Sequence, residues 1–95
     1  MTNLRRLARG MPCMVRLPGC DGGGETTVLA HYRLMGYSGI AKKPHDIMGA
    51  WACVRCHDLC DGRAHLPSLT RNEVRLAHAE GVMRTLAELQ KRGEL

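Results

Sequence analysis

The strongest structural signal in this sequence lies in ten residues, Ala52-Cys53-Val54-Arg55-Cys56-His57-Asp58-Leu59-Cys60-Asp61. They contain a Cys-x-x-Cys turn, formed by Cys53 and Cys56, with a histidine directly after it. Such a turn presents two thiolates to one metal ion, and a tetrahedral Zn²⁺ takes four such ligands. Two more cysteines, Cys13 and Cys20, lie upstream in a loop rich in proline and glycine. Two cysteine pairs separated by a long insert indicate a zinc site in a chain this short, so we predict one structural zinc on these four residues.

Three residues near the cysteine turn could take more than one role. Cys60 lies four residues after Cys56 and could compete for the zinc, although a small buried apolar residue is its commoner use. His57 could replace one cysteine as a ligand, or it could cap the helix that follows. Asp58 could serve only to favour the positive N-terminal end of that helix.

The cysteine count and the N-terminus favour a reduced protein. Five cysteines are an odd number for an oxidised scaffold. The first ten residues carry three arginines but no apolar h-region follows them, so we expect no signal peptide and a cytoplasmic location. No apolar run approaches the length of about 18 residues that a membrane helix needs, so no membrane partner is expected.

Length and composition predict one small domain with a thin core. The 95 residues include one Trp, two Tyr and no Phe, so burial depends on smaller apolar side chains. A structural zinc contributing on the order of 10 kcal/mol to folding would compensate. We divide the domain into a short basic arm or first helical turn (1–10), a zinc-bound core (11–66) and a C-terminal helix (67–95). The net charge of +5 favours a polyanionic partner such as nucleic acid.

The middle of the chain predicts strand, loop, strand, cysteine turn and helix. Residues 26–32 are rich in β-branched and apolar side chains, and residues 47–52 form a second short apolar run. A long connection, residues 33–46, joins these two runs. Residues 56–63 are expected to form the helix after the cysteine turn.

The C-terminal third predicts the longest helix. Thr70 and Glu73 form a capping-box pair, and apolar residues then repeat at helical spacing until Gly93. Gly81 in its middle could permit close packing. The expected fold class is therefore small α+β, with a hairpin, a helix and an additional C-terminal helix. His65 and His78 carry no spacing signal and are read as surface or packing residues.

Two histidines could work as a pair in this layout. His31 ends the first strand and His57 opens the helix after the turn, so they could face each other across a shallow cleft. One imidazole could deprotonate water while the other holds a divalent cation, which is the division of labour that phosphodiester cleavage requires. The alternative to a catalytic role is that His31 is simply a histidine at the end of a strand, hydrogen-bonded to the backbone.

Three segments resemble the core of HNH (ββα-metal) endonucleases, namely Ala30-His31-Tyr32-Arg33, Lys43-Pro44-His45-Asp46 and Ala52-Cys53-x-x-Cys56-His57-Asp58. The chain is more closely similar to the small prophage-encoded YbcO-like family of predicted nucleases. With that family it shares Arg-Gly-x-x-Cys at residues 9–13, Arg16-Leu17-Pro18-Gly19, Val28-Leu29-Ala30-His31 and the cysteine turn itself. The resemblance covers residues 1–66 well and the C-terminal helix loosely. It implies a zinc-stapled HNH-like core.

The resemblance also implies roles for single residues. His31 would be the general base that activates water, and His57 would be a ligand of a catalytic divalent ion such as Mg²⁺. Asp46 lies near the position of the family's middle Asn and would orient the base or touch the metal. His45 and Asp58 are nearby competitors for the role of Asp46.

The sequence departs from the HNH pattern at Ala30, where many HNH enzymes have a metal ligand before the base. Asp61 lies four residues after His57 on the same helix face, so it is the candidate replacement ligand. Water and substrate phosphate oxygens would fill the remaining positions, as they commonly do for Mg²⁺.

Basic residues surround these candidates. Arg33, Lys42 and Lys43 lie on the long connection, and Arg55 and Arg63 lie around the cysteine turn. Together they would form a rim that contacts nucleic-acid phosphates without reading sequence. The alternative for each of these residues, taken singly, is that it is part of a solvated, charged surface without a binding role.

The sequence thus predicts a metal-dependent endonuclease acting on phosphodiester bonds of nucleic acid, most plausibly DNA. The competing interpretation is a non-catalytic zinc-binding module that grips nucleic acid or a partner protein, which needs no second metal. A zinc-dependent deaminase is disfavoured, because its signature places a Glu two residues after a ligand His. His31 is followed by Tyr32 and Arg33 instead.

Overall fold

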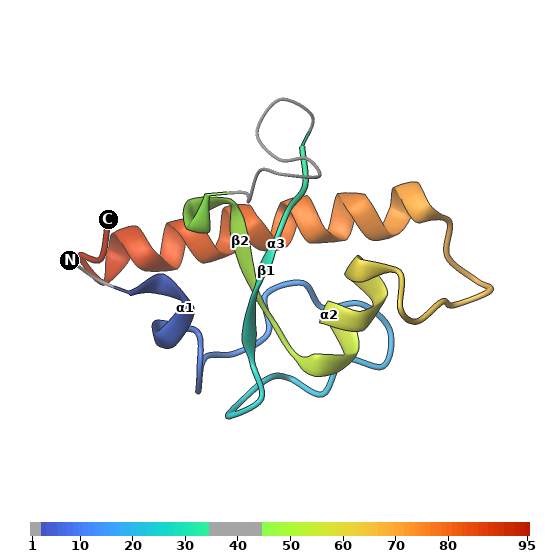
Figure 1. The fold of residues 1–95 in the computed structure, drawn as a ribbon, viewed down its shortest axis with the longest axis horizontal. Coiled ribbons are helices and arrows are strands. Elements are labelled where there is room, and N and C mark those ends of the chain that lie inside the picture. The colour runs from blue at the N-terminus through green and yellow to red at the C-terminus, as the bar shows by residue number, and fades with distance from the viewer. Residues whose placement is uncertain (1–2, 35–44) are drawn as a thin grey trace.

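The computed structural model describes residues 3–34 and 45–95 of the chain. Its elements, in order, are α1 (Leu4–Leu7), β1 (Val28–His31), the 3-10 helix η1 (Asp46–Met48), β2 (Gly49–Ala52), α2 (Val54–Asp61) and α3 (Arg71–Lys91). β1 and β2 pair antiparallel as a two-stranded sheet, with Leu29 opposite Trp51. Figure 1 shows the hairpin crossing the long helix α3, with α1 and α2 on opposite sides of it. The predicted small α+β fold, with a hairpin and helices, is confirmed.

Strand β2 lies in the centre of the fold. All four of its residues are buried, and Trp51 is fully inaccessible. The Trp51 amide donates to the Thr85 hydroxyl of α3 at 3.0 Å, and the Trp51 carbonyl accepts from the Met14 amide at 2.7 Å. β2 is therefore held by β1, by the chain near residue 14 and by α3, and this fixes the hairpin on the long helix.

Gly81 allows this close approach, as the sequence suggested. A Cβ added at Gly81 would lie 2.9 Å from Val15 Cγ2 and 3.1 Å from Val15 Cα. Val15 is almost completely buried, so it has little space into which to move. The N-terminal loop consequently packs directly on the backbone of α3 at this position.

The strands and the first helix are shorter than the sequence pattern predicts. β1 covers Val28–His31 rather than residues 26–32, and the run expected at 47–52 divides into η1 and β2. The Met48 amide donates to the His45 carbonyl at 2.9 Å, which closes the 3-10 turn before β2 begins. At the N-terminus, the interpretation of a first helical turn is confirmed by α1, which Asn3 caps.

Helix α2 begins at Val54, two residues before the predicted start at Cys56. The reason is that Cys53 acts as the N-cap, its sulfur accepting the Cys56 amide at 3.4 Å. The cysteine turn is thus the first turn of the helix itself. Asp58 consequently lies beyond the first turn, so the predicted favourable contact with the helix N-terminus is not made there.

The prediction for α3 is confirmed at its start. The Thr70 hydroxyl accepts the Glu73 amide and the Glu73 carboxylate accepts the Thr70 amide, which completes the capping box. Among residues 3–34 and 45–95, no helix is long and apolar enough to cross a membrane. Lys42 and Lys43, predicted to contact phosphate, lie outside the described residues.

Candidate functional site

Four cysteines meet at the start of α2. The Sγ atoms of Cys13, Cys20, Cys53 and Cys56 all lie within 4.8 Å of one another. Cys20 Sγ and Cys53 Sγ are 3.9 Å apart, close to the separation of about 3.8 Å expected for two thiolates on tetrahedral Zn²⁺ with bonds of about 2.3 Å. All five cysteines are free thiols, so the disulfide alternative is wrong. The cluster can hold one metal ion such as zinc.

The backbone around the cluster is arranged to support thiolates. The Gly22 amide donates to Cys20 Sγ at 3.3 Å, and the Cys56 amide donates to Cys53 Sγ at 3.4 Å. Gly23 has a φ of +89°, and a Cβ there would lie 2.5 Å from the Cys13 amide nitrogen. The first cysteine pair therefore depends on a glycine that lets two backbone segments touch.

The thiols of this cluster share their protons unequally. A hydrogen bond from the Cys56 thiol lowers the pKa of Cys13 to about 4, and the same contact raises the pKa of Cys56. One thiolate of this pair is thus stabilised by the proton of its neighbour. A divalent metal in the same space would replace that proton and favour deprotonation of both sulfurs, as zinc sites require.

Cys60 and His57 do not join the cysteine cluster. Cys60 is buried, and burial raises the pKa of its thiol to about 12, so it behaves as a small neutral core residue. His57 Nε2 instead lies 3.5 Å from Asp61 Oδ2, one turn along α2. The alternative in which His57 caps the helix is wrong, because Cys53 occupies the N-cap position.

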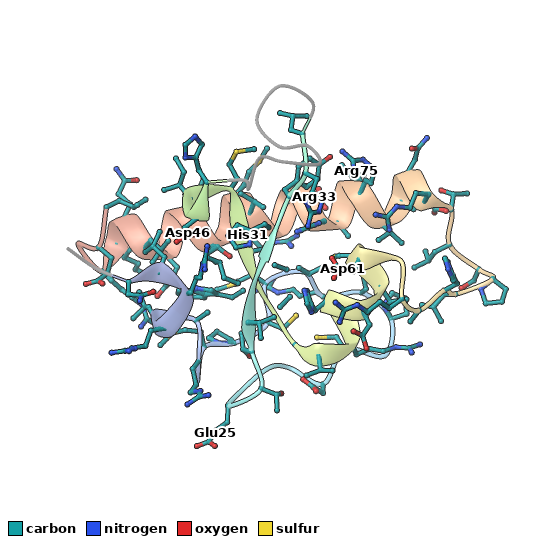
Figure 2. All side chains as sticks on the ribbon, in the orientation of Figure 1. Glu25, His31, Arg33, Asp46, Asp61 and Arg75 are labelled. Atoms are coloured by element: carbon teal, nitrogen blue, oxygen red, sulfur yellow. The ribbon has the colours of Figure 1, made fainter. Side chains whose placement is uncertain are left out.

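A small pocket opens between the end of β1, the end of α2 and the first half of α3. Its volume is about 90 Å³, and it is lined by His31, Arg33, Cys60, Asp61, Arg71, Arg75 and His78. Figure 2 shows His31, Arg33 and Arg75 above Asp61 of α2. Three residues that the sequence nominated, His31, Arg33 and Asp61, therefore share one pocket. His57 is not in its lining and reaches it only through Asp61.

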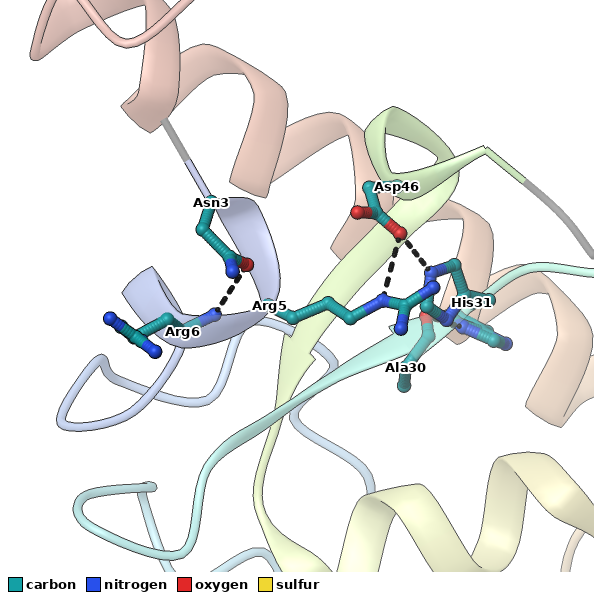
Figure 3. Close-up of polar contacts among 7 residues, drawn as sticks. Asn3, Arg5, Arg6, Ala30, His31 and Asp46 are labelled. Atoms are coloured by element: carbon teal, nitrogen blue, oxygen red, sulfur yellow. Dashed lines mark hydrogen bonds and ion pairs between the residues drawn. The ribbon is translucent and has the colours of Figure 1, made fainter. Parts of the chain in front are cut away.

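The side chain of His31 contacts a carboxylate. Its Nε2 lies 2.8 Å from Asp46 Oδ1, and the same oxygen accepts from Arg5 Nε at 3.2 Å. Figure 3 shows Arg5 reaching from α1 to this pair. The hydrogen bond to His31, followed by the charge of Arg5, lowers the pKa of Asp46, so this carboxyl is ionised at neutral pH. The sequence placed Asp46 near the base but did not anticipate Arg5.

The side of the pocket that sequence reasoning missed is a stripe on α3. Arg71, Arg75 and His78 recur at i, i+4 and i+7, which places them on one helix face. His78 is buried and donates from Nε2 to the Ala30 carbonyl at 2.8 Å. Burial lowers the pKa of His78, so the ring is neutral. The interpretation of His78 as a packing residue is confirmed. Its helical spacing from Arg71 and Arg75 is the sequence feature from which this wall of the pocket could have been predicted.

The remaining basic residues take different positions. Arg63 NH2 lies 3.6 Å from Asp61 Oδ2 at the edge of the pocket. Arg55 packs against Gly19, where an added Cβ would lie 3.1 Å from Arg55 Nε, so it flanks the cysteine loop and not the pocket. The described basic residues that were predicted to form one phosphate-contacting rim therefore lie on two separate parts of the surface.

The Asp46 contacts predict a specific pH dependence of stability. Because folding lowers the pKa of Asp46 from 3.8, its contribution is present above that value and is lost as the pH falls through the lower folded pKa. At neutral pH, Asp46→Asn should therefore melt a few degrees below the wild type, and this gap should close in acid. Melting curves between neutral and strongly acidic pH measure it. The exposed carboxylate variant Glu25→Gln is the control, and a gap for Asp46→Asn that is independent of pH would contradict the assignment.

Comparisons with known proteins agree with one another. The family model described as "Putative nuclease YbcO" matches residues 2–94. The chain is 52% identical over 66 residues to proteins of that name from Escherichia coli strain K12 and from Enterobacteria phage 82, covering 68% of this chain and 69% of each relative. A solved structure described as a putative bacteriophage protein from Escherichia coli K-12 is similar with a TM-score of 0.79 and 38% identity. That match covers 96% of this chain and 100% of the solved one.

Proposed function

The chain belongs to the YbcO family, and from this premise we propose that it is a metal-dependent endonuclease of the HNH type. Its substrate would be the phosphodiester backbone of nucleic acid, and DNA is the form we propose. The observation that carries the proposal is the pocket in which His31 meets Asp61 and three arginines. A base, an anionic metal ligand and positive charge are the groups that phosphodiester hydrolysis needs.

His31 is the proposed general base. If Nε2–H donates to the ionised Asp46, the lone pair of the neutral imidazole is on Nδ1. Nδ1 is then the nitrogen that takes a proton from the attacking water, and Asp46 stabilises the imidazolium that forms. Arg5 of α1 contacts Asp46, 41 residues further along the chain, so the first helix supports the base through Asp46.

Two metal roles are proposed. Cys13, Cys20, Cys53 and Cys56 would hold a structural zinc that fixes the start of α2 against the N-terminal loop. His57 and Asp61, whose side chains meet at 3.5 Å, would supply two ligands for a catalytic divalent ion. Such an ion would lower the barrier by polarising the phosphate and stabilising the leaving oxygen.

The catalytic ion would have few protein ligands. Within the described part of the chain, the four cysteines are the one group of three or more candidate ligands that lie together. Ala30 is buried and offers no side-chain ligand. This favours an ion that keeps several waters, as Mg²⁺ does, and it is also the observation that favours the alternative of a non-catalytic zinc-binding module.

Metal add-back separates the two functions. Zinc-loaded protein should nick plasmid DNA when Mg²⁺ or Mn²⁺ is added, and Asp61→Ala should lower the rate at least about tenfold, since losing an outer or direct metal contact costs about 10–100-fold. Binding of Mn²⁺, followed by electron paramagnetic resonance, should weaken in the same variant. Glu25→Ala is the matched control, because Glu25 lies far from the pocket (Figure 2). If wild-type protein neither nicks DNA nor binds Mn²⁺ beside its zinc, the binding-module alternative is correct.

A further inference from the structure

Two arginines of α3, Arg71 and Arg75, line the same pocket as Asp61. The sequence predicted α3 from its capping box and its apolar spacing, and its basic residues were given no function. In the folded chain, two of its arginines line the same 90 Å³ pocket as His31. The helix that closes the core is thus also one side of the candidate site.

Arg75 is held beside His31 by two separate contacts. Its guanidinium carbon lies 4.6 Å from the centre of the Tyr32 ring, and its NH2 donates to the Arg33 carbonyl at 3.2 Å. Tyr32 and Arg33 are the two residues that directly follow His31 in the chain. The cation is therefore tethered to the backbone segment that carries the base, and its position relative to His31 is fixed at low entropic cost.

Arg71 has a different task. Its NH1 donates to the Leu59 carbonyl at 3.1 Å and its NH2 to the Cys60 carbonyl at 2.6 Å, so it joins the end of α2 to the start of α3. The Leu59 carbonyl also accepts the Gly62 amide at 3.3 Å, so Arg71 adds a second donor at the end of α2. Arg71 thus adds positive charge to the pocket while it holds two backbone carbonyls. Arg75 holds one carbonyl, and none of the ion pairs among residues 3–34 and 45–95 involves it.

The charge of the pocket is positive. Three arginines line it against one carboxylate, Asp61, which itself contacts His57 and Arg63. His78 is neutral and fixed by the Ala30 carbonyl, so it adds shape and no charge. A space of about 90 Å³ has room for a single tetrahedral anion.

We propose that Arg75, together with Arg33 and Arg71, binds the phosphate group that is to be cleaved. This inference rests on the proposed nuclease function and names the group that supplies positive charge at the reacting phosphate. The guanidinium of Arg75 donates to a non-bridging oxygen in the geometry that phosphate favours. The positive charge of α3 would add to that of a metal ion with few protein ligands, since Ala30 supplies none.

The test is a binding measurement that needs no cleavage. Zinc-loaded protein without added Mg²⁺ or Mn²⁺ is titrated into a fluorescent DNA oligonucleotide at several salt concentrations. Arg75→Gln, which keeps the stem and one donor group, should weaken DNA binding about tenfold. The slope of log K against log salt concentration should also fall by about one, which corresponds to the loss of one phosphate contact. Arg75→Lys should recover part of both losses. Lys91→Ala, an exposed cation at the far end of α3, should change neither.

The outcomes distinguish the phosphate role from a structural one. Inorganic phosphate should displace the oligonucleotide from wild-type protein more readily than from Arg75→Gln. If Arg75→Gln matches the wild type in affinity and salt slope, Arg75 does not bind phosphate and the proposal is wrong. If Arg75→Gln lowers the melting temperature and Arg75→Lys restores neither binding nor slope, the residue only positions Tyr32, and the proposal is again overturned. A protein that binds DNA through Arg75 but never cuts it would refute the nuclease function and leave the phosphate pocket standing.

Discussion

Substitution of Cys53 by serine should release the metal and unfold the domain at room temperature. The change is small in volume and leaves a hydroxyl at the N-cap of α2, where serine is a favoured residue. What it removes is one soft thiolate from the four-cysteine cluster. A structural zinc contributes on the order of 10 kcal/mol, as much as the whole stability of a typical small domain, about 5–15 kcal/mol. We therefore expect loss of the fold and not a modest shift of melting temperature.

Three measurements check this expectation. Metal content by mass spectrometry under native conditions should fall from one zinc per chain to none, and circular dichroism should lose most of its helical signal. Chelator treatment of the wild type should reproduce both effects. The control is Cys60→Ala, a buried cysteine of the same helix outside the cluster, which should keep its zinc and lose roughly 1–2 kcal/mol. A Cys53→Ser variant that stays folded without metal would contradict the structural role of the site.

The expected size of this effect follows from the composition of the core. Cys13, Cys53 and Cys56 are themselves buried members of the main apolar cluster, beside Val15 and Leu59. Without the metal, three thiol positions would lie at the centre of a core that contains no Phe. A metal ion on the four cysteines would thus replace the large aromatic anchor that the chain lacks in this half of the molecule. Trp51 performs that task in the second cluster, where it packs near Leu89.

The parts of this fold that depend on local chemistry were predictable from the sequence. The residue type and spacing of the four cysteines predicted that they would form one cluster, and the capping box at Thr70 and Glu73 marked the start of α3. The start of α2 was misplaced because Cys53 does two things at once, as a cluster member and as a helix cap. Propensity rules treat these roles separately, so the overlap moved the boundary by two residues.

The parts that depend on tertiary contact were not predictable. Arg5 reaches Asp46 across 41 residues, and Arg75 reaches the Arg33 carbonyl across 42. No periodicity within one element encodes such a pairing, because it depends on how the hairpin crosses α3. The stripe of Arg71, Arg75 and His78 was visible in the sequence, but an amphipathic helix with charged residues usually turns them to solvent. The family resemblance nominated His31 and the i, i+4 spacing to His57 nominated Asp61, and the folded chain adds two arginines of α3 to the same pocket.

Replacement of His31 by alanine should abolish most nuclease activity while the protein stays folded. Removing a general base lowers the rate by about 10²–10⁴-fold. The His31 side chain is 21% exposed and its partner Asp46 is 36% exposed, so the lost contact is a surface one worth little to stability. Zinc content should therefore match that of the wild type, and the melting temperature should fall by no more than the few degrees expected for Asp46→Asn. The assay is Mg²⁺- or Mn²⁺-dependent plasmid nicking by the zinc-loaded protein.

Two additions make this experiment decisive. His65→Ala removes an exposed histidine outside the pocket and should nick plasmid at the wild-type rate. Added imidazole should restore part of the activity of His31→Ala, because a small base can enter the space that the ring vacates, and it should not affect Asp61→Ala, whose defect is in metal binding. Wild-type activity in His31→Ala would remove this residue from the mechanism. Asp46 would then hold no base in place, so the proposed role of Arg5 and α1 in supporting the site would also be wrong.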